Sequence, residues 1–386
     1  GIVIKDSYVE DYAYAHTAIP NASSITIGNS DLTTNVGAVG FMVRGVERNA
    51  VNSTWDVNQD IFVRGNSDNT RLGVRRAHNN DIVNFNGNIS LSNFNATRDF
   101  QLYYERDISQ RDANGGDSFR QEAFINLTGD ITGGDRRIRT LIEQVGGPYT
   151  GWTQTQERVE GSQSLTNEPD WVVFWTLTGN NSDWTGSLEV GNREGTSTSS
   201  GGPDFDKQHF MRFGNNDGAV TYAINATNQV ILRHNATLQA YGSQVTIGNL
   251  YSDGNASTST TFPQDGFWGS QVVSNSYLEN GGTMAASFTI NQTTNRVFSG
   301  VVRDGTYYTP TGSNLASAAL SLFKDGPGVL ALNQSNYYTG ATTIRGGDLN
   351  VDGIHVGGGA YSVLSGGALG GTGIVVSSVQ VADGGG

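Results

Sequence analysis

The chain has 386 residues, enough for two or three ordinary domains or for one long repeat structure. Its net charge of −13 argues against nucleic acid as a partner, because phosphate binding needs clustered Lys and Arg. The absence of cysteine excludes disulfides, thiolate zinc sites and cysteine nucleophiles. Glycine is abundant at 52 residues, Pro is rare at 7 and aromatic residues make up 10%, so the composition predicts a folded, all-β chain with many turns.

The first half of the chain contains short strand-forming runs that end at Asn or Gly. The opening residues 1–16, GIVIKDSYVEDYAYAH, indicate a cap or an inserting strand. The run ITIGN at 25–29 recurs as VTIGN at 245–249, and LEVGN at 188–192 ends a strand in the same way. Asn and Gly tolerate the left-handed conformations of tight turns. We also expect stacked Asn side chains to form amide ladders inside the fold.

Three stretches interrupt this rhythm. We expect residues 106–124, 146–171 and 191–210 to be loops that protrude from the body of the molecule. The run RIRTLIEQV at 137–145 fits either two helical turns or a strand. The weakly polar run at 315–323 is too short to cross a bilayer, so no membrane-spanning segment is expected. No signal peptide is present and residue 1 is Gly, so we interpret the chain as a mature form or an excised piece.

The C-terminal part repeats with a period near 20 residues. Leu330 and Leu332 share one strand parity, and a glycine pair then resets the parity so that Leu349 and Val351 can point to the same interior. Leu349 follows Leu330 by 19 residues, and Leu369 follows after another 20. Each run is too short to bury its own side chains, but stacked coils share backbone hydrogen bonds and a core. The sequence therefore predicts one continuous β-solenoid over residues 1–386, with about 15 to 19 coils of about 20 to 25 residues.

Residues 320–353 resemble the autotransporter-associated β-strand repeat. The likeness extends to a repeat region at 320–386, and residues 180–325 are similar to upstream elements of autotransporter passenger domains. The resemblance implies a right-handed parallel β-helix that a bacterium exports to its outer surface or to the extracellular space. The family is defined by its scaffold, so the resemblance implies no catalytic residue and no cofactor. The residues that match the repeat are Lys324, Gly326, Gly328, Leu330, Leu332, Asn336, Tyr338, Gly340, Thr342, Thr343, Gly347 and Leu349. Ile344 and Val351 are further inward-facing positions of the same repeat.

Two enzymatic alternatives have weak support in the sequence. The run GTSTSSGGP at 195–203 is faintly similar to the serine motif of subtilisin-like proteases, but none of the five histidines lies in a matching context. Asp204 and Asp206 form the best local pair of carboxylates for a polysaccharide lyase or hydrolase. Because pairs of surface aspartates are common, we expect no catalytic residue, and a polysaccharide-acting enzyme is the alternative.

Metal binding has a similarly weak signal. The calcium-binding β-roll repeats Gly-Gly-x-Gly-x-Asp in tandem, whereas TGGDRR at 132–137 and RGGDLNVDG at 345–353 are isolated fragments. Turn aspartates that accept hydrogen bonds from their own backbone explain both fragments better. We expect no metal site and no cofactor, with a structural Ca²⁺ as the alternative.

Aromatic residues indicate a contact surface at Tyr149, Trp152, Trp171 and Trp175. Alternation along WVVFW places Trp171 and Trp175 on one side of a strand and Phe174 on the other. Packing in the core or beneath loops is the first interpretation. Contact with a sugar or a neighbouring subunit is the second, because exposed aromatic rings bind both.

These observations predict a non-enzymatic, secreted or cell-surface structural solenoid. Its end coils would expose unpaired strand edges, so rods of this kind can join end to end into filaments, with the chain itself as partner. Alternatively, the rod acts as an adhesin whose partners are surface glycans or host and matrix ligands. Neither version involves nucleic acid.

Overall fold

The structure of the chain is a computed structural model. Among the described residues every regular element is a β-strand, as the composition predicts. No helix among them is long and apolar enough to cross a membrane. The model describes residues 2–4, 8–12, 22–30, 33, 39–44, 54–67, 69–75, 81–107, 121–145, 171–191, 193, 207–214, 220–225, 227–252, 271–275, 284–308, 314–316 and 318–386.

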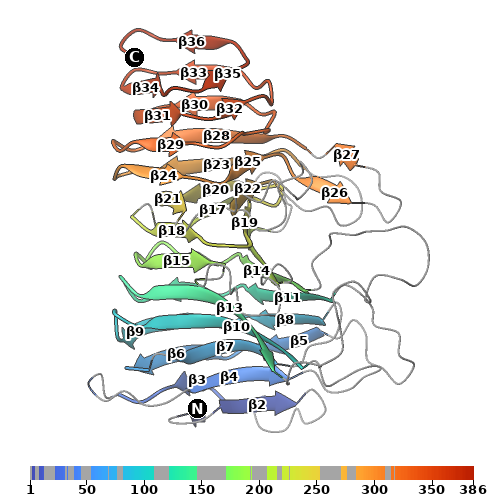
Figure 1. Cartoon of the computed structure of the whole chain (residues 1–386). Coiled ribbons are helices and arrows are strands. Elements are labelled where there is room, and N and C mark those ends of the chain that lie inside the picture. The colour runs from blue at the N-terminus through green and yellow to red at the C-terminus, as the bar shows by residue number, and fades with distance from the viewer. Residues whose placement is uncertain are drawn as a thin grey trace, which may run out of the picture.

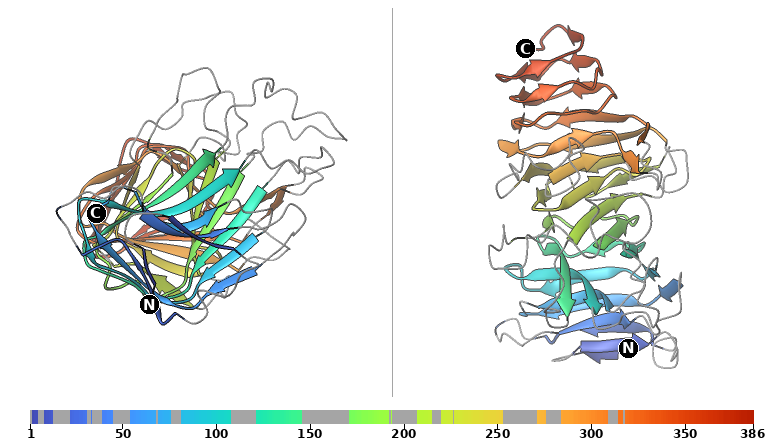
Figure 2. Two further views of the ribbon diagram at one scale, coloured as in Figure 1. Left: turned by 90° about the horizontal axis from the view of Figure 1, so that it is seen from below. Right: turned by 45° about the vertical axis from the view of Figure 1, so that its right-hand side comes forward.

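The strands wind into a parallel β-helix with three strands in a typical coil. Each strand hydrogen-bonds in parallel with the strand at the same place in the next coil, so the coils stack from the N-terminal to the C-terminal end (Figure 1). Figure 2 shows the same strands wound around a common axis when the molecule is seen from below. The expected parallel β-solenoid is thereby confirmed.

Three faces result, which we call face 1, face 2 and face 3. An isolated bridge between Asn181 and Ile224 joins the two parts of face 1, and a bridge between Asn336 and His355 leads face 3 into its last strands. On face 2, β24 continues the ladder beside β21. One antiparallel hairpin, β26 (Thr306–Tyr308) and β27 (Asn314–Ala316), stands outside the three faces.

Face 1 consists of β1 (Ile2–Ile4), β3 (Ser24–Ile27), β6 (Asp60–Gly65), β9 (Ile89–Phe94), β12 (Ile131–Thr132), β17 (Thr221–Ala223), β20 (Gln244–Ile247), β23 (Ala286–Asn291), β28 (Leu320–Asp325), β30 (Thr342–Ile344), β33 (Tyr361–Val363) and β36 (Val379–Val381). Face 2 consists of β2 (Tyr8–Tyr12), β4 (Val39–Arg44), β7 (Thr70–Arg75), β10 (Asp99–Asp107), β13 (Arg137–Val145), β15 (Ser187–Val190), β18 (Gln229–Leu232), β21 (Asn249–Ser252), β24 (Arg296–Phe298), β29 (Leu330–Leu332), β31 (Gly347–Val351) and β34 (Gly367–Gly370). Face 3 consists of β5 (Thr54–Val57), β8 (Asp81–Phe85), β11 (Gln121–Leu127), β14 (Trp171–Leu177), β16 (Lys207–Phe213), β19 (Ala236–Gln239), β22 (Gln271–Ser274), β25 (Val301–Arg303), β32 (Ile354–His355) and β35 (Ile374–Val375).

A single apolar core runs the length of the helix. Side chains alternate along each strand, so every second residue points inward and meets the residue in register above and below it. Each face contributes a column, and these inward residues are almost completely buried. The column of face 2 includes Phe100, Ile138, Leu188, Val230 and Leu250, and that of face 3 includes Val83, Ile125, Trp175, Met211, Leu238 and Val273.

The corner between face 3 and face 1 is held by a ladder of polar side chains. Asp60 Oδ1 accepts from the backbone N–H of Asn88 at 2.9 Å, and Asn88 Oδ1 accepts from that of Asp130 at 2.9 Å. Asp130 Oδ1 in turn accepts from the N–H of Asn180 at 2.7 Å. This ladder lies on the exposed corner. A side-chain oxygen serves well there, because each coil needs an acceptor for a backbone donor that the turn leaves unpaired. The expected Asn side-chain ladder is present on face 3, where Asn126 Nδ2 donates to Asn84 Oδ1 at 2.8 Å and Asn84 Nδ2 donates to Asp56 Oδ1 at 2.7 Å, but it lies outside the apolar core.

The coils are longer and fewer than the period predicts. Asn88 and Asp130 occupy the same position in neighbouring coils although 42 residues separate them, and Ile131 and Asn181 are 50 residues apart. Over its described part the chain therefore makes about twelve coils. The spacing near 20 holds between β18 and β21 and towards the C-terminal end, because insertions at the coil corners lengthen most of the earlier coils.

The predicted loop boundaries need correction at their ends. Strand β10 continues to Asp107 and β11 begins at Gln121, so only part of 106–124 lies between strands. Trp171 opens β14 and Lys207 opens β16, which shortens the second and third stretches in the same way. Parallel pairing carries these strands further than their polar sequence indicates. Apart from Gly191 and Arg193, the remaining residues of the three stretches lie outside the described residues. The run at 137–145 is a strand, β13.

Candidate functional site

The outer side of face 2 is the strongest candidate for a functional surface. On β10, Phe100, Leu102 and Tyr104 point into the core, so the alternating residues between them point outward. Because β7, β10, β13, β15 and β18 pair in register, their outward side chains form continuous rows. These rows and the residues directly after β15 and β18 carry two adjacent networks of ion pairs.

The first network surrounds Tyr103. Arg71 binds Glu143 with both Nη atoms at 2.8 and 2.9 Å and donates from Nε to Gln101 at 2.9 Å. The Tyr103 hydroxyl lies 2.7 Å from Glu105 Oε2 and 3.0 Å from Glu143 Oε2, and the guanidinium of Arg71 lies 4.3 Å from the Tyr103 ring centroid. Burial, reinforced by the hydrogen bond with Glu105, raises the pKa of Tyr103. The hydroxyl therefore stays protonated and donates its one proton to the carboxyl group of Glu105 or to that of Glu143.

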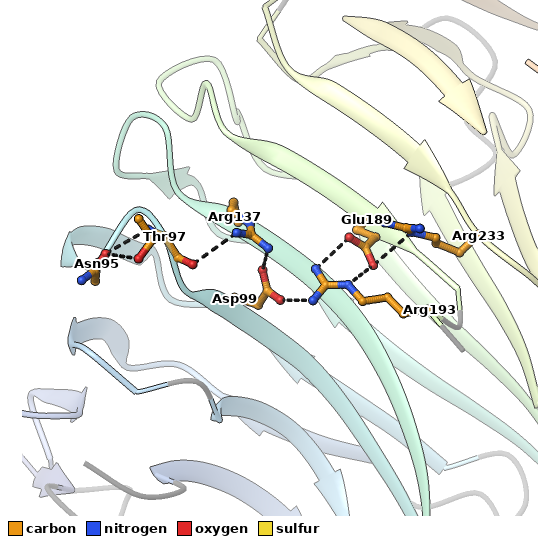
Figure 3. A network of polar contacts seen from close by, with 7 residues as sticks. All are labelled: Asn95, Thr97, Asp99, Arg137, Glu189, Arg193 and Arg233. Carbon is orange, nitrogen blue, oxygen red and sulfur yellow. Dashed lines mark hydrogen bonds and ion pairs between the residues drawn. The ribbon is translucent and has the colours of Figure 1, made fainter. Parts of the chain in front are cut away.

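The second network links three strands through two carboxylates (Figure 3). Asp99 binds Arg137 and Arg193, each at 2.6 Å. Arg193 also binds Glu189 with two parallel hydrogen bonds of 2.5 and 2.8 Å, and Arg233 lies 3.4 Å from the same carboxylate. The hydrogen bond to Glu189, together with that to Asp99, raises the pKa of Arg193, so its charge is permanent.

A turn before β10 holds one end of this network in place. Asn95 Oδ1 accepts hydrogen bonds from the backbone N–H and the hydroxyl of Thr97, each at 2.9 Å, which is the geometry of an Asx turn. The carbonyl of Thr97 then accepts from Arg137 Nη1 at 3.2 Å. Arg137 is consequently oriented from two sides before any ligand arrives.

Trp175 is not part of a contact surface, and that prediction needs correction. Its side chain is 0% exposed and lies in the core between Ile125 and Met211. Its ring stacks on His209 with the centroids 5.5 Å apart. The first interpretation, core packing, therefore holds for Trp175. Trp171 is the first residue of β14, while its side chain, Tyr149 and Trp152 lie outside the described residues.

Face 3 carries an aromatic stack that sequence reasoning missed. The rings of Phe124 and Phe174 are 5.0 Å apart and parallel, and Phe210 follows at 4.8 Å. Arg212 covers Phe174 at 3.7 Å from the ring centroid. Alternation along WVVFW separates Phe174 from Trp175, but only the register of the folded strands reveals its partners. Phe174 is 0% and Phe210 2% exposed, so these two rings stabilise the sheet and are not open to a ligand, whereas Phe124 is half-buried.

The predicted repeat residues occupy the places that the pattern assigns to them. Leu330 pairs with Leu349, which pairs with Leu369, and Leu332 pairs with Val351. Gly326 and Gly347 have positive φ angles of 78° and 59° at coil corners, where glycine is favoured. Gly328 and Gly340 lie where a coil passes close to its neighbour. The buried members of the set are Lys324, Gly328, Leu330, Leu332, Asn336, Tyr338, Gly340, Thr342, Ile344, Leu349 and Val351.

Two buried polar residues of the repeat, Lys324 and Asn336, form hydrogen bonds that hold coil corners in place. The ammonium of Lys324 donates to the carbonyls of Asp325, Gly326 and Gly346 at 2.9 to 3.0 Å, so it joins two successive coil corners. Burial lowers the pKa of Lys324 to about 8. Asn336 Oδ1 accepts from the N–H of Val302 at 2.9 Å and thereby fixes the next corner.

A buried hydrogen-bonded cluster closes the core of the last coils. His355 Nε2 donates to the carbonyl of Tyr338 at 2.9 Å, and its Nδ1 accepts from the Tyr361 hydroxyl at 2.9 Å. The Tyr361 hydroxyl lies 3.2 Å from that of Tyr338, which lies 2.6 Å from the hydroxyl of Thr342. Burial lowers the pKa of His355 and raises that of both tyrosines, so the neutral forms are favoured throughout.

This cluster predicts a loss of stability in acid. The folded-state pKa of His355 lies below the unfolded value of about 6.5, so the unfolded chain takes up the proton first as the pH falls. The free energy of unfolding should therefore fall below pH 6.5, by at most about 1.4 kcal/mol for each pH unit from this residue. Urea unfolding of the protein and of His355→Gln at pH 7.5 and 5.5 measures the contribution of His355 to the pH dependence of the free energy of unfolding. An equal pH dependence in the two proteins would contradict it.

Catalytic and metal-binding arrangements have little support in the described part of the chain. No three His, Cys, Asp or Glu side chains gather there as a group that could hold a metal ion. Asp204 and Asp206 lie outside the described residues. A structural Ca²⁺ therefore stays a prediction without a site.

Comparison with known proteins adds to the geometry at the C-terminal end. Residues 322–351 match the family model of the passenger-associated-transport-repeat. A segment of 76 residues, 19% of the chain, is 42% identical to part of the adhesin BmaC autotransporter of Brucella suis biovar 1 (strain 1330), and covers 2% of the length of that protein. No solved structure matches the chain. The protein is a bacterial protein exported to the cell surface, and it carries an autotransporter passenger repeat.

Proposed function

We propose that the chain is a non-enzymatic adhesive element of the bacterial surface and that the outer side of face 2 contacts its ligand. The observation that carries the proposal is the gathering of ion-paired Arg, Asp and Glu side chains on one flat sheet of a rigid rod. The similarity to a protein named as an adhesin agrees with this role.

The geometry suits a polar ligand. The guanidinium groups of face 2 are already oriented by carboxylates, so little side-chain freedom remains to be lost on binding. Arg137 and Arg193 keep 39% and 32% of their side-chain surface exposed, which leaves donors for a partner. An aromatic contact by Tyr149, Trp152 and Trp171 is a second part of the proposal and awaits its own test.

An adhesion assay tests the role of face 2. Beads that carry the chain are incubated with host cells and matrix, and the retained fraction is counted. The double variant Arg137→Gln/Arg233→Gln should retain severalfold fewer beads, whereas Arg345→Gln, an exposed arginine of a distant coil, should behave as the original chain. Trp152→Ala and Trp171→Ala test the aromatic contact in parallel. Equal adhesion by all variants would contradict ligand binding at both places.

The alternative of a polysaccharide-acting enzyme has one observation in its favour. Glu105 and Glu143 approach the same Tyr103 hydroxyl on the outer side of a parallel sheet. However, Arg75 binds Glu105 and Arg71 binds Glu143, so each carboxyl group already has an ion-pair partner. Release of reducing ends or unsaturated sugars from a polysaccharide panel, abolished by Asp204→Asn or Glu143→Gln, would favour the enzyme.

End-to-end assembly is a separate proposal. Val379 and Val381 of β36 occupy inward positions in register with Tyr361 and Val363, yet they are 44% and 57% exposed. Another coil, from a continuation of the chain or from a second copy, would cover them. Electron microscopy of the purified chain distinguishes isolated rods from filaments.

A further inference from the structure

We infer that Arg139, with Arg137, Arg193 and Arg233, forms a binding site for an acidic polysaccharide on the outer side of face 2. This inference rests on the proposed adhesive function and names the chemical class of its ligand. Its evidence is the position of Arg139, its lack of a partner and the polarity of its surroundings.

Arg139 lies at the centre of the outer side of face 2. It is in register with Gln101 of β10 on one side and with Glu189 of β15 on the other. Among the described residues, these four arginines have two carboxylates as neighbours, those of Asp99 and Glu189. The group therefore has two positive charges in excess on a chain whose net charge is −13.

Arg139 is the arginine that this arrangement leaves without a partner. Its neighbour Glu189 is occupied by Arg193 and Arg233, and Asp99 is occupied by Arg137 and Arg193. Arg139 makes no hydrogen bond or ion pair with any residue that the structure describes, and its Nε atom is buried without an acceptor. A buried guanidinium nitrogen without an acceptor costs stability, so an anion that reaches it from outside gains that energy.

The lowered pKa of Arg139 agrees with the interpretation that its guanidinium group can accept an anionic ligand. Burial lowers the pKa of Arg139, and the nearby charge of Arg193 lowers it further. Glu189 and Asp99 oppose this shift but do not remove it. A carboxylate or sulfate beside Arg139 would offset both causes.

The surroundings favour a polysaccharide over a protein as the ligand. Protein interfaces have an apolar core, whereas both residues in register with Arg139, Gln101 and Glu189, are polar, and the apolar outward residues Leu141 and Ile231 lie two residues along its strand and two strands away, respectively. The planar guanidinium binds carboxylates and sulfates with two parallel hydrogen bonds. Strands that lie about 4.8 Å apart present the arginines in successive rows, which suits an extended polymer with repeated charges.

Direct binding measurements test the site. Surface plasmon resonance with the whole chain uses heparin, hyaluronan, neutral dextran and polyglutamate as probes. The chain should bind heparin or hyaluronan at low salt, bind them less at high salt and ignore dextran. Arg139→Gln should weaken binding about tenfold without lowering the thermal unfolding midpoint, since it breaks no ion pair. Arg345→Gln is the matched control and should bind within about twofold of the original chain.

Each other outcome overturns the inference. Absence of binding to both acidic polysaccharides, or equal binding by Arg139→Gln, would exclude the site. Equal or tighter binding of polyglutamate would assign the site to an acidic protein segment. The adhesion assay separates the two proposals, because adhesion that Arg139→Gln leaves intact supports the adhesive function and excludes this ligand. A chain that binds heparin but adheres to no cell or matrix would exclude the adhesive function.

Discussion

Trp175→Ala is expected to lower the free energy of unfolding by about 3 to 5 kcal/mol. The indole is 0% exposed, stacks on His209 and fills the inward column of face 3 between Ile125 and Met211. Alanine leaves a cavity that the rigid ladders on both sides cannot close, because their backbones are fixed by parallel hydrogen bonds. Urea unfolding followed by circular dichroism measures the loss.

The control for this variant is Tyr337→Ala. Tyr337 is 46% exposed, so its removal should change the free energy of unfolding by less than about 0.5 kcal/mol. Folded Trp175→Ala protein should also bind its ligand as the original chain does. A variant that keeps its stability but loses binding would show that Trp175 contacts the ligand after all.

Gly340→Ala is expected to cost about 3 kcal/mol or more. A Cβ at this position would lie 2.2 Å from the carbonyl oxygen of Leu320 and 2.5 Å from its carbonyl carbon, both in the preceding coil. These backbone atoms belong to β28 and pair with neighbours on both sides, so the coils would have to separate. The backbone N–H of Gly340 also donates to that same carbonyl at 3.1 Å, and this bond would break.

Gly346→Ala is the control for Gly340→Ala. It shows whether the loss of stability comes from the close approach of two coils or from the replacement of any glycine in the repeat. In the same repeat, a Cβ on Gly346 would have its nearest neighbour, the carbonyl oxygen of Gly326, at 3.6 Å, which is ordinary contact. This variant should unfold at the same urea concentration or slightly higher, since alanine restricts the unfolded chain. Equal losses in the two variants would contradict the coil spacing of the structure.

Much of the fold follows from strand parity and period. The positions of Leu330, Leu349 and Leu369 in one column were predictable, because their spacing and alternation allow one arrangement that points all three towards the core. The repeat residues at coil corners were predictable for the same reason. The earlier coils were not, because insertions of variable length at the corners remove the period while the pairing survives.

The candidate site on face 2 could not be predicted from local sequence. Asp99 meets Arg193, and Arg71 meets Glu143 across 72 residues, only because intervening coils bring them into register. In the sequence these residues are isolated charges, typical of any solvated surface. Trp175 shows the converse error, since a cluster of tryptophans in sequence indicates a contact surface until the core is known to bury one of them.

Cross-linking of engineered cysteines tests the stacking of remote strands on face 2 most directly. The natural chain has no cysteine, so each pair is unambiguous. Ser187 and Gln229 are partners in β15 and β18. The account predicts that Ser187→Cys/Gln229→Cys forms a disulfide on mild oxidation, whereas Ser187→Cys/Ile231→Cys, with Cα atoms about 8 Å apart, does not. Failure of the first pair, or equal oxidation of the second, would contradict the register that brings the arginines of face 2 together.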